Sequence, residues 1–156
     1  MPTLTILVGL PGSGKSTWRA EHTAAVIISS DDLIDEFAAA NGLTYSEAFK
    51  KVDMKQIQRD IMSRFQTALV EGRDIIVDRT NMPRKSRALF LNGVPDTYHR
   101  RAVVFRVPEE ELKRRLRERA SATGKFIPEH VVLGMQSSYQ EPTLDEGFQE
   151  VVFISQ

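Results

Sequence analysis

Residues 9–18 read GLPGSGKSTW, which places glycines, one lysine and three hydroxyl side chains in the spacing of a phosphate-binding loop. The pattern from Gly9 to Ser16 is the complete Walker A motif, and it follows an apolar run, as the motif requires. Glycine lets successive backbone N–H groups turn toward phosphate oxygens, while the lysine reaches the β- and γ-phosphates. The Ser16 hydroxyl is suited to bind Mg²⁺. We therefore expect ATP or another nucleoside triphosphate, with Mg²⁺, to bind at Gly12, Ser13, Gly14, Lys15, Ser16 and Thr17.

Acidic residues follow the apolar runs 25–28 and 74–77. Ligands of open parallel sheets gather outside the carboxyl ends of the strands, so Asp31, Asp32 and Asp78 should face the phosphate-binding loop. The helix that begins after the first pair needs an N-cap, and one of these two aspartates can supply it. Because one aspartate is enough for the cap, the other is available for chemistry. We expect Asp31 to accept the proton of an attacking hydroxyl. Asp78 ends a Walker B-like run and either organises Mg²⁺ through water, orients the acceptor or has only a structural role.

Residues 108–128, PEEELKRRLRERASATGKFIP, predict a helix with acidic residues first and basic residues last. Arg115 and Arg119 are one turn apart, on a stripe beside the two leucines that mark the buried side. This order of charges suits the helix dipole, so a plain solvated helix explains it. The functional alternative is a lid over about residues 115–128, whose arginines neutralise the charge that develops on the phosphates.

Five apolar runs, rich in valine and isoleucine, alternate with helical patterns along the chain. Runs without polar alternation are typical of strands that are buried on both faces. Because helices separate these strands, the pattern predicts right-handed crossovers and a three-layer α/β fold with a parallel sheet in the middle. The expected strands are 4–8, 25–28, 74–77, 102–107 and 151–154.

Two helices have clear signals in the sequence. A candidate capping box at Thr44 and Glu47 predicts the start of a helix. Its apolar stripe is formed by Phe49, Val52, Ile57, Ile61, Phe65 and Leu69. The helix after the phosphate-binding loop contains Trp18, which we expect to pack this helix against the sheet.

The composition excludes several classes of protein. The chain has 156 residues, no cysteine and a formal net charge of zero. This length predicts a single domain over residues 1–156, and the lack of cysteine excludes disulfides, thiolate metal sites and a cysteine nucleophile. Any binding of nucleic acid must depend on a local basic patch. No segment resembles a signal peptide or approaches membrane-spanning length, so we expect a cytoplasmic protein without a membrane partner.

The chain resembles the kinase domain of phage-type polynucleotide 5′-hydroxyl kinases, which belong to the adenylate-kinase-like P-loop kinases. The resemblance covers nearly the whole chain. It rests on GLPGSGKSTW, Asp31-Asp32, Val77-Asp78 followed by Thr80-Asn81, the helix after Val107-Pro108 with Arg115 and Arg119, Lys125, Pro128, Met135 and Tyr139. It implies a five-stranded parallel sheet in the order 2-3-1-4-5, with helices on both faces and an arginine-bearing lid.

The resemblance also implies roles for single residues. Asp31 would be the general base of the reaction. The residues implied to serve the phosphates and Mg²⁺ are Lys15, Ser16 and Arg119, with Arg115 as a partner in the lid. Asp78 would help shape the acceptor side, where we also place Asp32 as a candidate. The family has an arginine for the acceptor phosphate three residues after the base, where this chain has Ile34. Arg79 is our candidate to supply the missing charge.

These observations favour transfer of the γ-phosphoryl group of a nucleoside triphosphate to a hydroxyl on DNA or RNA. The expected acceptor is a polynucleotide 5′-hydroxyl or a hydroxymethyl pyrimidine in DNA. One alternative is a small-molecule kinase for a nucleoside, sugar or antibiotic, and another is a nucleotide-dependent switch. A switch requires a group that positions an attacking water, and no clear candidate is present. The preference of the donor site for one base, and the oligomeric state, stay open.

Overall fold

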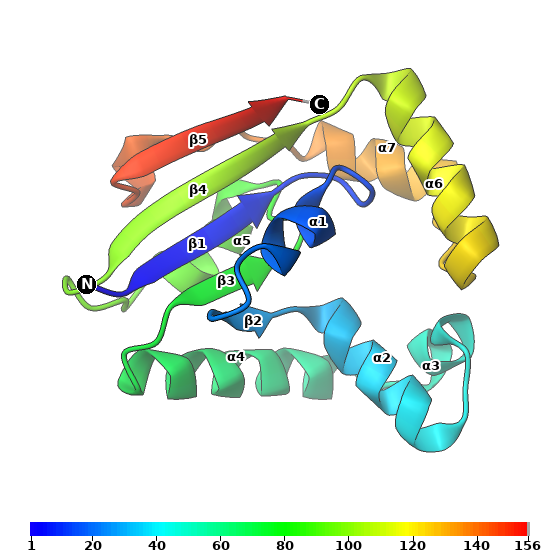
Figure 1. The fold of residues 1–156 in the computed structure, drawn as a ribbon, viewed down its shortest axis with the longest axis horizontal. Coiled ribbons are helices and arrows are strands. Elements are labelled where there is room, and N and C mark those ends of the chain that lie inside the picture. Colours follow the sequence, from blue (N-terminus) through cyan, green and yellow to red (C-terminus); the bar gives the residue numbers. More distant parts are fainter. Residues whose placement is uncertain (156) are drawn as a thin grey trace.

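The computed structural model of the protein describes residues 1–155, which form a parallel five-stranded sheet with helices on both faces (Figure 1). The elements are β1 (Thr3–Val8), α1 (Lys15–Ala20), β2 (Val26–Ile28), α2 (Ser30–Asn41), α3 (Tyr45–Lys51), α4 (Met54–Val70), β3 (Ile75–Asp78), α5 (Arg84–Leu91), β4 (His99–Arg106), α6 (Glu109–Thr123), α7 (Glu129–Ser137), the 3₁₀ helix η1 (Leu144–Glu146) and β5 (Glu150–Ser155). The strand order is β2-β3-β1-β4-β5. The predicted fold class, strand order and five strands are thus confirmed, and the strand ends shift by at most three residues.

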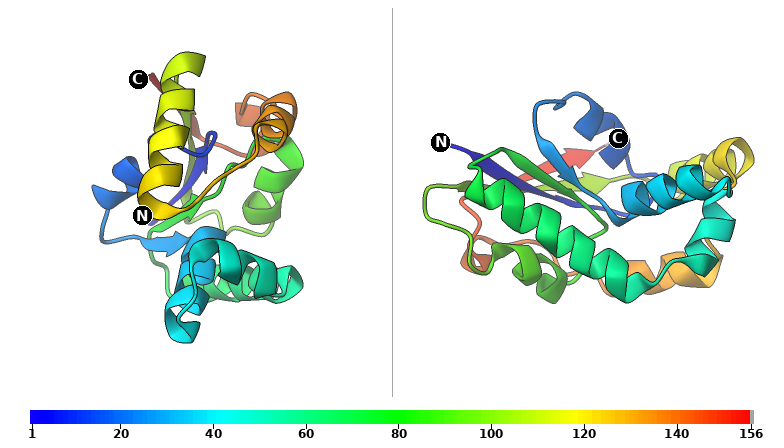
Figure 2. Two further views of the ribbon diagram at one scale, coloured as in Figure 1. Left: turned by 90° about the vertical axis from the view of Figure 1, so that its right-hand side faces the viewer. Right: turned by 90° about the horizontal axis from the view of Figure 1, so that it is seen from below.

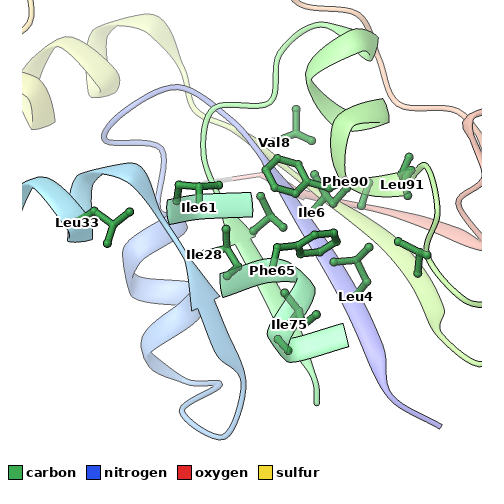
Figure 3. Close-up of a cluster of buried hydrophobic side chains, with 14 of the residues drawn as sticks. Leu4, Ile6, Val8, Ile28, Leu33, Ile61, Phe65, Ile75, Phe90 and Leu91 are labelled. Carbon is green, nitrogen blue, oxygen red and sulfur yellow. The ribbon is translucent and has the colours of Figure 1, made fainter. Parts of the chain in front are cut away.

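The side chains of the central strands alternate between two apolar layers. On one face, residues of β1, β2 and β3 pack with Ile61 and Phe65 of α4 and with Phe90 of α5 (Figure 3). On the other face, Leu7, Ile76, Val103 and Phe105 form a smaller cluster under α1. Burial of each large side chain is worth about 1.5–3 kcal/mol, so this central sheet supports the loops at its carboxyl edge.

The prediction for Trp18 is confirmed. The indole ring lies edge-on against Phe105, with ring centroids 6.5 Å apart, and joins the smaller cluster. It therefore anchors α1, and with it the phosphate-binding loop, to the sheet.

The helix predicted to start at Thr44 is instead two helices. The capping box is present at α3, but Val52 has extended backbone and Asp53 caps a new helix by accepting a hydrogen bond from the Lys55 N–H. Phe49, on α3, is 50% exposed and is therefore not part of the buried stripe of α4. Helix α4 has 17 residues and is the longest, and no helix within residues 1–155 is long and apolar enough to span a membrane.

A buried ion pair holds the connection between β3 and α5. The guanidinium of Arg87, fully buried, donates to both carboxylate oxygens of Glu146 across 2.8 and 3.0 Å. Its third nitrogen donates to the carbonyl oxygens of Asn81 and Met82, both across 2.9 Å. Arg87 therefore ties η1 to the segment that follows the carboxyl end of β3.

We expect Arg87→Ala to lower the free energy of unfolding by about 3–5 kcal/mol, because it leaves the buried Glu146 carboxylate without its partner. Arg84→Ala is the matched control on the same helix. Arg84 pairs with the neighbouring Asp145, but their side chains are 45% and 70% exposed, and we expect a loss of about 0–1 kcal/mol. Urea unfolding at 25 °C measures both, and equal losses would contradict this ranking.

Candidate active site

The phosphate-binding loop has the backbone shape of a polyphosphate cradle. Gly12 and Gly14 have φ values of +81° and +107°, which only glycine adopts without strain. A Cβ atom on Gly9 would lie 2.6 Å from Ser13 Oγ, so a side chain does not fit there. Gly14 caps α1 without a side-chain hydrogen bond, which leaves the first N–H groups of the helix to a ligand. These features fit a bound triphosphate.

Lys15 is the buried cation of this loop. The residue is only 9% exposed and forms no ion pair within residues 1–155. Burial lowers the pKa of Lys15 to about 8, although the nearby carboxylates of Asp78 and Asp31 act in the opposite direction. A buried ammonium group close to two carboxylates can bind phosphate oxygens as a strong point charge.

The three hydroxyl residues of the loop lie in different environments. Ser16 and Thr17 are exposed on the first turn of α1, where ligands reach them. Ser13 is buried, and its N–H donates to the Leu10 carbonyl across 3.1 Å. Its hydroxyl oxygen is buried, and the residue lines an apolar cavity of about 240 Å³ together with Tyr139. The side chain of Ser13 is therefore directed inward.

Asp31 does not cap its own helix, and neither does Asp32. Helix α2 begins at Ser30, before both aspartates, and its N-cap is Ser29, whose hydroxyl accepts a hydrogen bond from the Asp32 N–H. The expectation that one aspartate caps this helix is therefore wrong, because a serine in extended conformation precedes them. Asp31 Oδ1 instead accepts a hydrogen bond of 2.6 Å from the hydroxyl of Tyr45.

Arg19 connects the two acidic positions, and the sequence analysis missed it. Its guanidinium donates to both oxygens of Asp32 across 2.9 Å and to Asp78 Oδ2 across 2.8 Å. Asp78 is the more buried partner, with 10% of its side chain exposed. Arg19 is four residues after Lys15, so the two lie on the same face of α1, and that spacing was the available signal. Arg19 thus joins α1, which follows the loop, to the first turn of α2 and to the end of β3.

Helix α6 reaches over the site. Figure 2 (left) shows α6 and α7 on one side of the carboxyl edge of the sheet and α2 with α3 on the other. The Arg119 guanidinium lies 3.6 Å from Asp31 Oδ2, and Lys125 forms an ion pair of 3.0 Å with Asp35. The hydroxyl of Ser46 donates to the Gly124 carbonyl across 3.1 Å. The end of α6 and the residues that follow it therefore contact α2, which carries Asp31, and the neighbouring α3.

Arg115 lies directly above the phosphate-binding loop. One of its nitrogens donates to the Gly12 carbonyl across 3.3 Å, and Nε donates to Glu111 across 2.9 Å. Hydrogen bonds from Arg114 and Arg115 lower the pKa of Glu111 to about 2, so this carboxylate stays ionised. The paired Glu111 holds the Arg115 side chain against the loop.

Arg79 lies apart from these residues. Its guanidinium is 5.9 Å from the ring centroid of Phe90, and Arg79 forms no ion pair within residues 1–155. It lines a small polar pocket of about 130 Å³ that includes Gln58 and Ser86. Burial lowers the pKa of Arg79. Ile34 is buried in the core, so its position offers no charge to a ligand.

No group of three or more histidine, cysteine or acidic side chains within residues 1–155 could enclose a metal ion. Mg²⁺ does not need such a group, because it keeps several waters and binds through few protein oxygens and the phosphates of the substrate. The exposed hydroxyl of Ser16 beside the loop fits this manner of binding.

A sequence profile of the AAA domain family matches residues 4–142 of the chain. The heterogeneous nuclear ribonucleoprotein U-like protein 2 of Mus musculus is 26% identical over 161 residues, which cover 95% of this chain. The match covers 21% of that protein, so the chain spans only a small part of the length of this curated relative.

Two solved structures show the same fold. A chain of the Pnkp1/Rnl/Hen1 RNA repair complex is 26% identical with a TM-score of 0.67, and the match covers 88% of this chain and 43% of that one. A gluconokinase from Sinorhizobium meliloti 1021 is 18% identical with a TM-score of 0.58, over 99% of this chain and 82% of that one. With its parallel sheet and complete phosphate-binding loop, the chain has the P-loop kinase fold and belongs to the AAA domain family.

Proposed function

We propose that this protein transfers the terminal phosphoryl group of ATP, or another nucleoside triphosphate, to a hydroxyl on nucleic acid. A polynucleotide 5′-hydroxyl, as in the phage-type kinases, is the first acceptor to consider, and a hydroxymethyl pyrimidine in DNA is the second. One observation carries the proposal. The Asp31 carboxylate is not used by its own helix, and it lies near enough to the buried Lys15 ammonium to influence its pKa.

The proposed mechanism assigns one task to each side chain. Lys15 and the N–H groups of the loop bind the phosphates, and Asp31 accepts the proton of the acceptor hydroxyl. The acceptor oxygen attacks the terminal phosphorus in line with the departing diphosphate. Arg119 and Arg115 neutralise the charge that develops, in a lid over residues 115–128. Mg²⁺ would supply further positive charge at the phosphates, with the Ser16 hydroxyl as its protein ligand.

The proposed acceptor side contains carboxylates held by an ion-pair network and exposed aromatic side chains. Arg19 holds both Asp32 and Asp78, and we propose that Asp78 shapes the acceptor site through this network. The aromatic side chains of Phe49 and Phe126 are 50% and 73% exposed on α3 and between α6 and α7. Exposed aromatic rings provide stacking surfaces for the bases of single strands. The RNA repair complex among the structural relatives also favours a nucleic-acid acceptor.

A small-molecule acceptor is the second candidate. The match to the gluconokinase covers 82% of that chain, whereas the match to the RNA repair chain covers 43%. A kinase of this size therefore exists with a small acceptor. The zero net charge of the chain also gives no general attraction for nucleic acid.

A labelling experiment separates these candidates. The protein is incubated with ATP labelled at the γ-position and with four acceptors in parallel: a 5′-hydroxyl DNA oligonucleotide, the matching RNA, duplex DNA that contains hydroxymethyl pyrimidines, and a free nucleoside. Label on one of the polymers supports the proposal, and loss of label with rising salt adds support. Label on the free nucleoside alone would contradict the proposal of a nucleic-acid acceptor.

The lowered pKa of Lys15 predicts a pH dependence of nucleotide binding. Phosphates bind the charged ammonium, whereas above pH 8 the free protein increasingly holds a neutral amine, because the pKa of Lys15 is about 8. We expect the Kd of the nucleotide to rise with pH above 8, by up to about tenfold per unit. Calorimetric titration from pH 7 to pH 9.5 measures this. Lys15→Met, which cannot titrate, should bind weakly with little dependence on pH, and an equal slope in both proteins would contradict the assignment.

A further inference from the structure

Tyr45, on which no part of the proposed mechanism depends, is rigidly placed. It is the first residue of α3, and the capping box around it is complete. The Glu47 N–H donates to Thr44 Oγ1 across 3.2 Å, and the Thr44 N–H donates to Glu47 Oε1 across 3.0 Å. A helix start with both bonds has little freedom, so the direction of the Tyr45 side chain is well defined.

The phenol of Tyr45 reaches across to the neighbouring helix. Its hydroxyl donates to Asp31 Oδ1 across 2.6 Å. A hydrogen bond from a hydroxyl to a carboxylate at this distance is charge-assisted and about twice as strong as a neutral one. It fixes the rotation of the carboxyl group of Asp31, whose side chain is otherwise half exposed.

The two carboxylate oxygens of Asp31 are thereby distinguished. Oδ1 accepts the hydrogen bond from the Tyr45 hydroxyl, while Oδ2 has, within residues 1–155, only the longer contact of 3.6 Å with the guanidinium of Arg119. Oδ2 is therefore the oxygen with room for a further hydrogen bond.

We propose that Tyr45 is a positioning residue for phosphoryl transfer, and that its hydroxyl holds Asp31 so that Oδ2 takes the proton of the acceptor. This inference rests on the proposed function of Asp31. In the step, the O–H bond of the acceptor breaks and its proton moves to Oδ2. A bond forms between the acceptor oxygen and the terminal phosphorus, and the bond from that phosphorus to the bridging oxygen of the donor breaks.

The face of the Tyr45 ring contacts the segment that follows α6. The Lys125 ammonium lies 4.6 Å from the ring centroid, and the neighbouring Ser46 bonds to the Gly124 carbonyl. Burial, followed by the hydrogen bond to Asp31, raises the pKa of Tyr45 well above its ordinary value. The hydroxyl therefore remains a donor throughout the pH range in which the protein works.

The test is Tyr45→Phe, which keeps the ring over Lys125 and removes only the hydroxyl. We expect kcat to fall about 10- to 100-fold, the worth of one hydrogen bond to a charged group, with an unchanged KM for ATP. Tyr98→Phe is the matched control, because its hydroxyl donates to the Arg73 carbonyl across 2.7 Å, away from the site. This control should lower Tm and leave kcat unchanged.

A second readout needs neither donor nor acceptor. The ¹³Cγ signal of Asp31 should move in Tyr45→Phe and stay in place in Tyr98→Phe, because only the first change removes a bond to this carboxyl group. A kcat within twofold of wild type in Tyr45→Phe, or an unmoved Asp31 signal, would overturn the inference. If the wild-type protein labels no acceptor, the proposed function itself fails. Wild-type activity that collapses in Asp31→Asn but not in Tyr45→Phe refutes the role of Tyr45 alone.

Discussion

Asp31→Asn is expected to lower kcat by about 10²- to 10⁴-fold, the usual contribution of a positioned base. The amide has the size of the carboxylate and still accepts the hydrogen bond of 2.6 Å that Tyr45 donates, but it cannot take a proton. Because Asp31 does not cap α2, we expect the Tm to stay close to that of the wild type. Calorimetric titration should give an unchanged Kd for ATP, since the phosphates are bound by the loop and Lys15.

Glu36→Gln is the control for this prediction. Glu36 lies on the same helix and also loses one charge, but its carboxylate pairs with Arg64 on the surface, with 57% of the side chain exposed. We expect a kcat within about twofold of wild type, because Glu36 pairs with Arg64 rather than with a residue of the site. The loss of stability should be about 0–1 kcal/mol, as for other exposed pairs. Unchanged transfer in Asp31→Asn would remove Asp31 from the mechanism.

The second large effect is expected for Arg119→Ala, which should lower kcat by about 10³-fold, as removal of a positioned arginine does in other phosphoryl transfers. The Arg119 side chain is 26% exposed and its guanidinium lies 3.6 Å from Asp31 Oδ2, so it can neutralise charge on either reacting group. The ion pair spans 3.6 Å and is half exposed on the Asp31 side, so we expect a loss of stability of no more than about 1 kcal/mol.

Arg117→Ala is the matched control, two residues earlier on the exposed face of α6. It removes the same charge from the same helix and should leave kcat unchanged. Single-turnover rates of the two variants measure the effect on phosphoryl transfer, and urea unfolding of the same variants measures the effect on stability. Equal rate losses would show that the charge of the helix matters rather than the position of Arg119, and unfolding of Arg119→Ala would contradict its place in a lid.

The sequence predicted the fold because the signals for it are local. A strand buried on both faces shows itself as a short run such as 75–77, and the parallel direction of the strands follows from the helices between the runs. The order of the strands was implied by the resemblance to the polynucleotide kinases. The helix break at Val52 and Asp53 was missed, because an apolar stripe continues through it with nearly helical spacing. The break depends on one side-chain cap, that of Asp53. The free energy of such a cap is small, and the spacing of apolar residues gives no sign of it.

The candidate site also has one part that local sequence signals predicted and another part that they did not. The phosphate-binding loop is one contiguous stretch, so its residues were identified from spacing alone. Arg19, which joins Asp32 to the distant Asp78, and Arg87, which joins the buried Glu146, were not. From the sequence, a charged residue in a helix is expected to be exposed to solvent. Its buried partner becomes visible only in the folded structure, because that partner belongs to another element.

By itself, the sequence of this protein determined the triphosphate cradle, a parallel α/β fold class and a short list of carboxylates near the cradle. Each of these depends on neighbours in the chain or on the period of a strand or helix. Only the tertiary structure decided what those carboxylates do: Ser29 caps α2, Arg19 binds Asp32, and Tyr45 holds one oxygen of Asp31. The physical reason is that hydrogen bonds act over about 3 Å and depend on direction, and packing brings their partners together from separate elements.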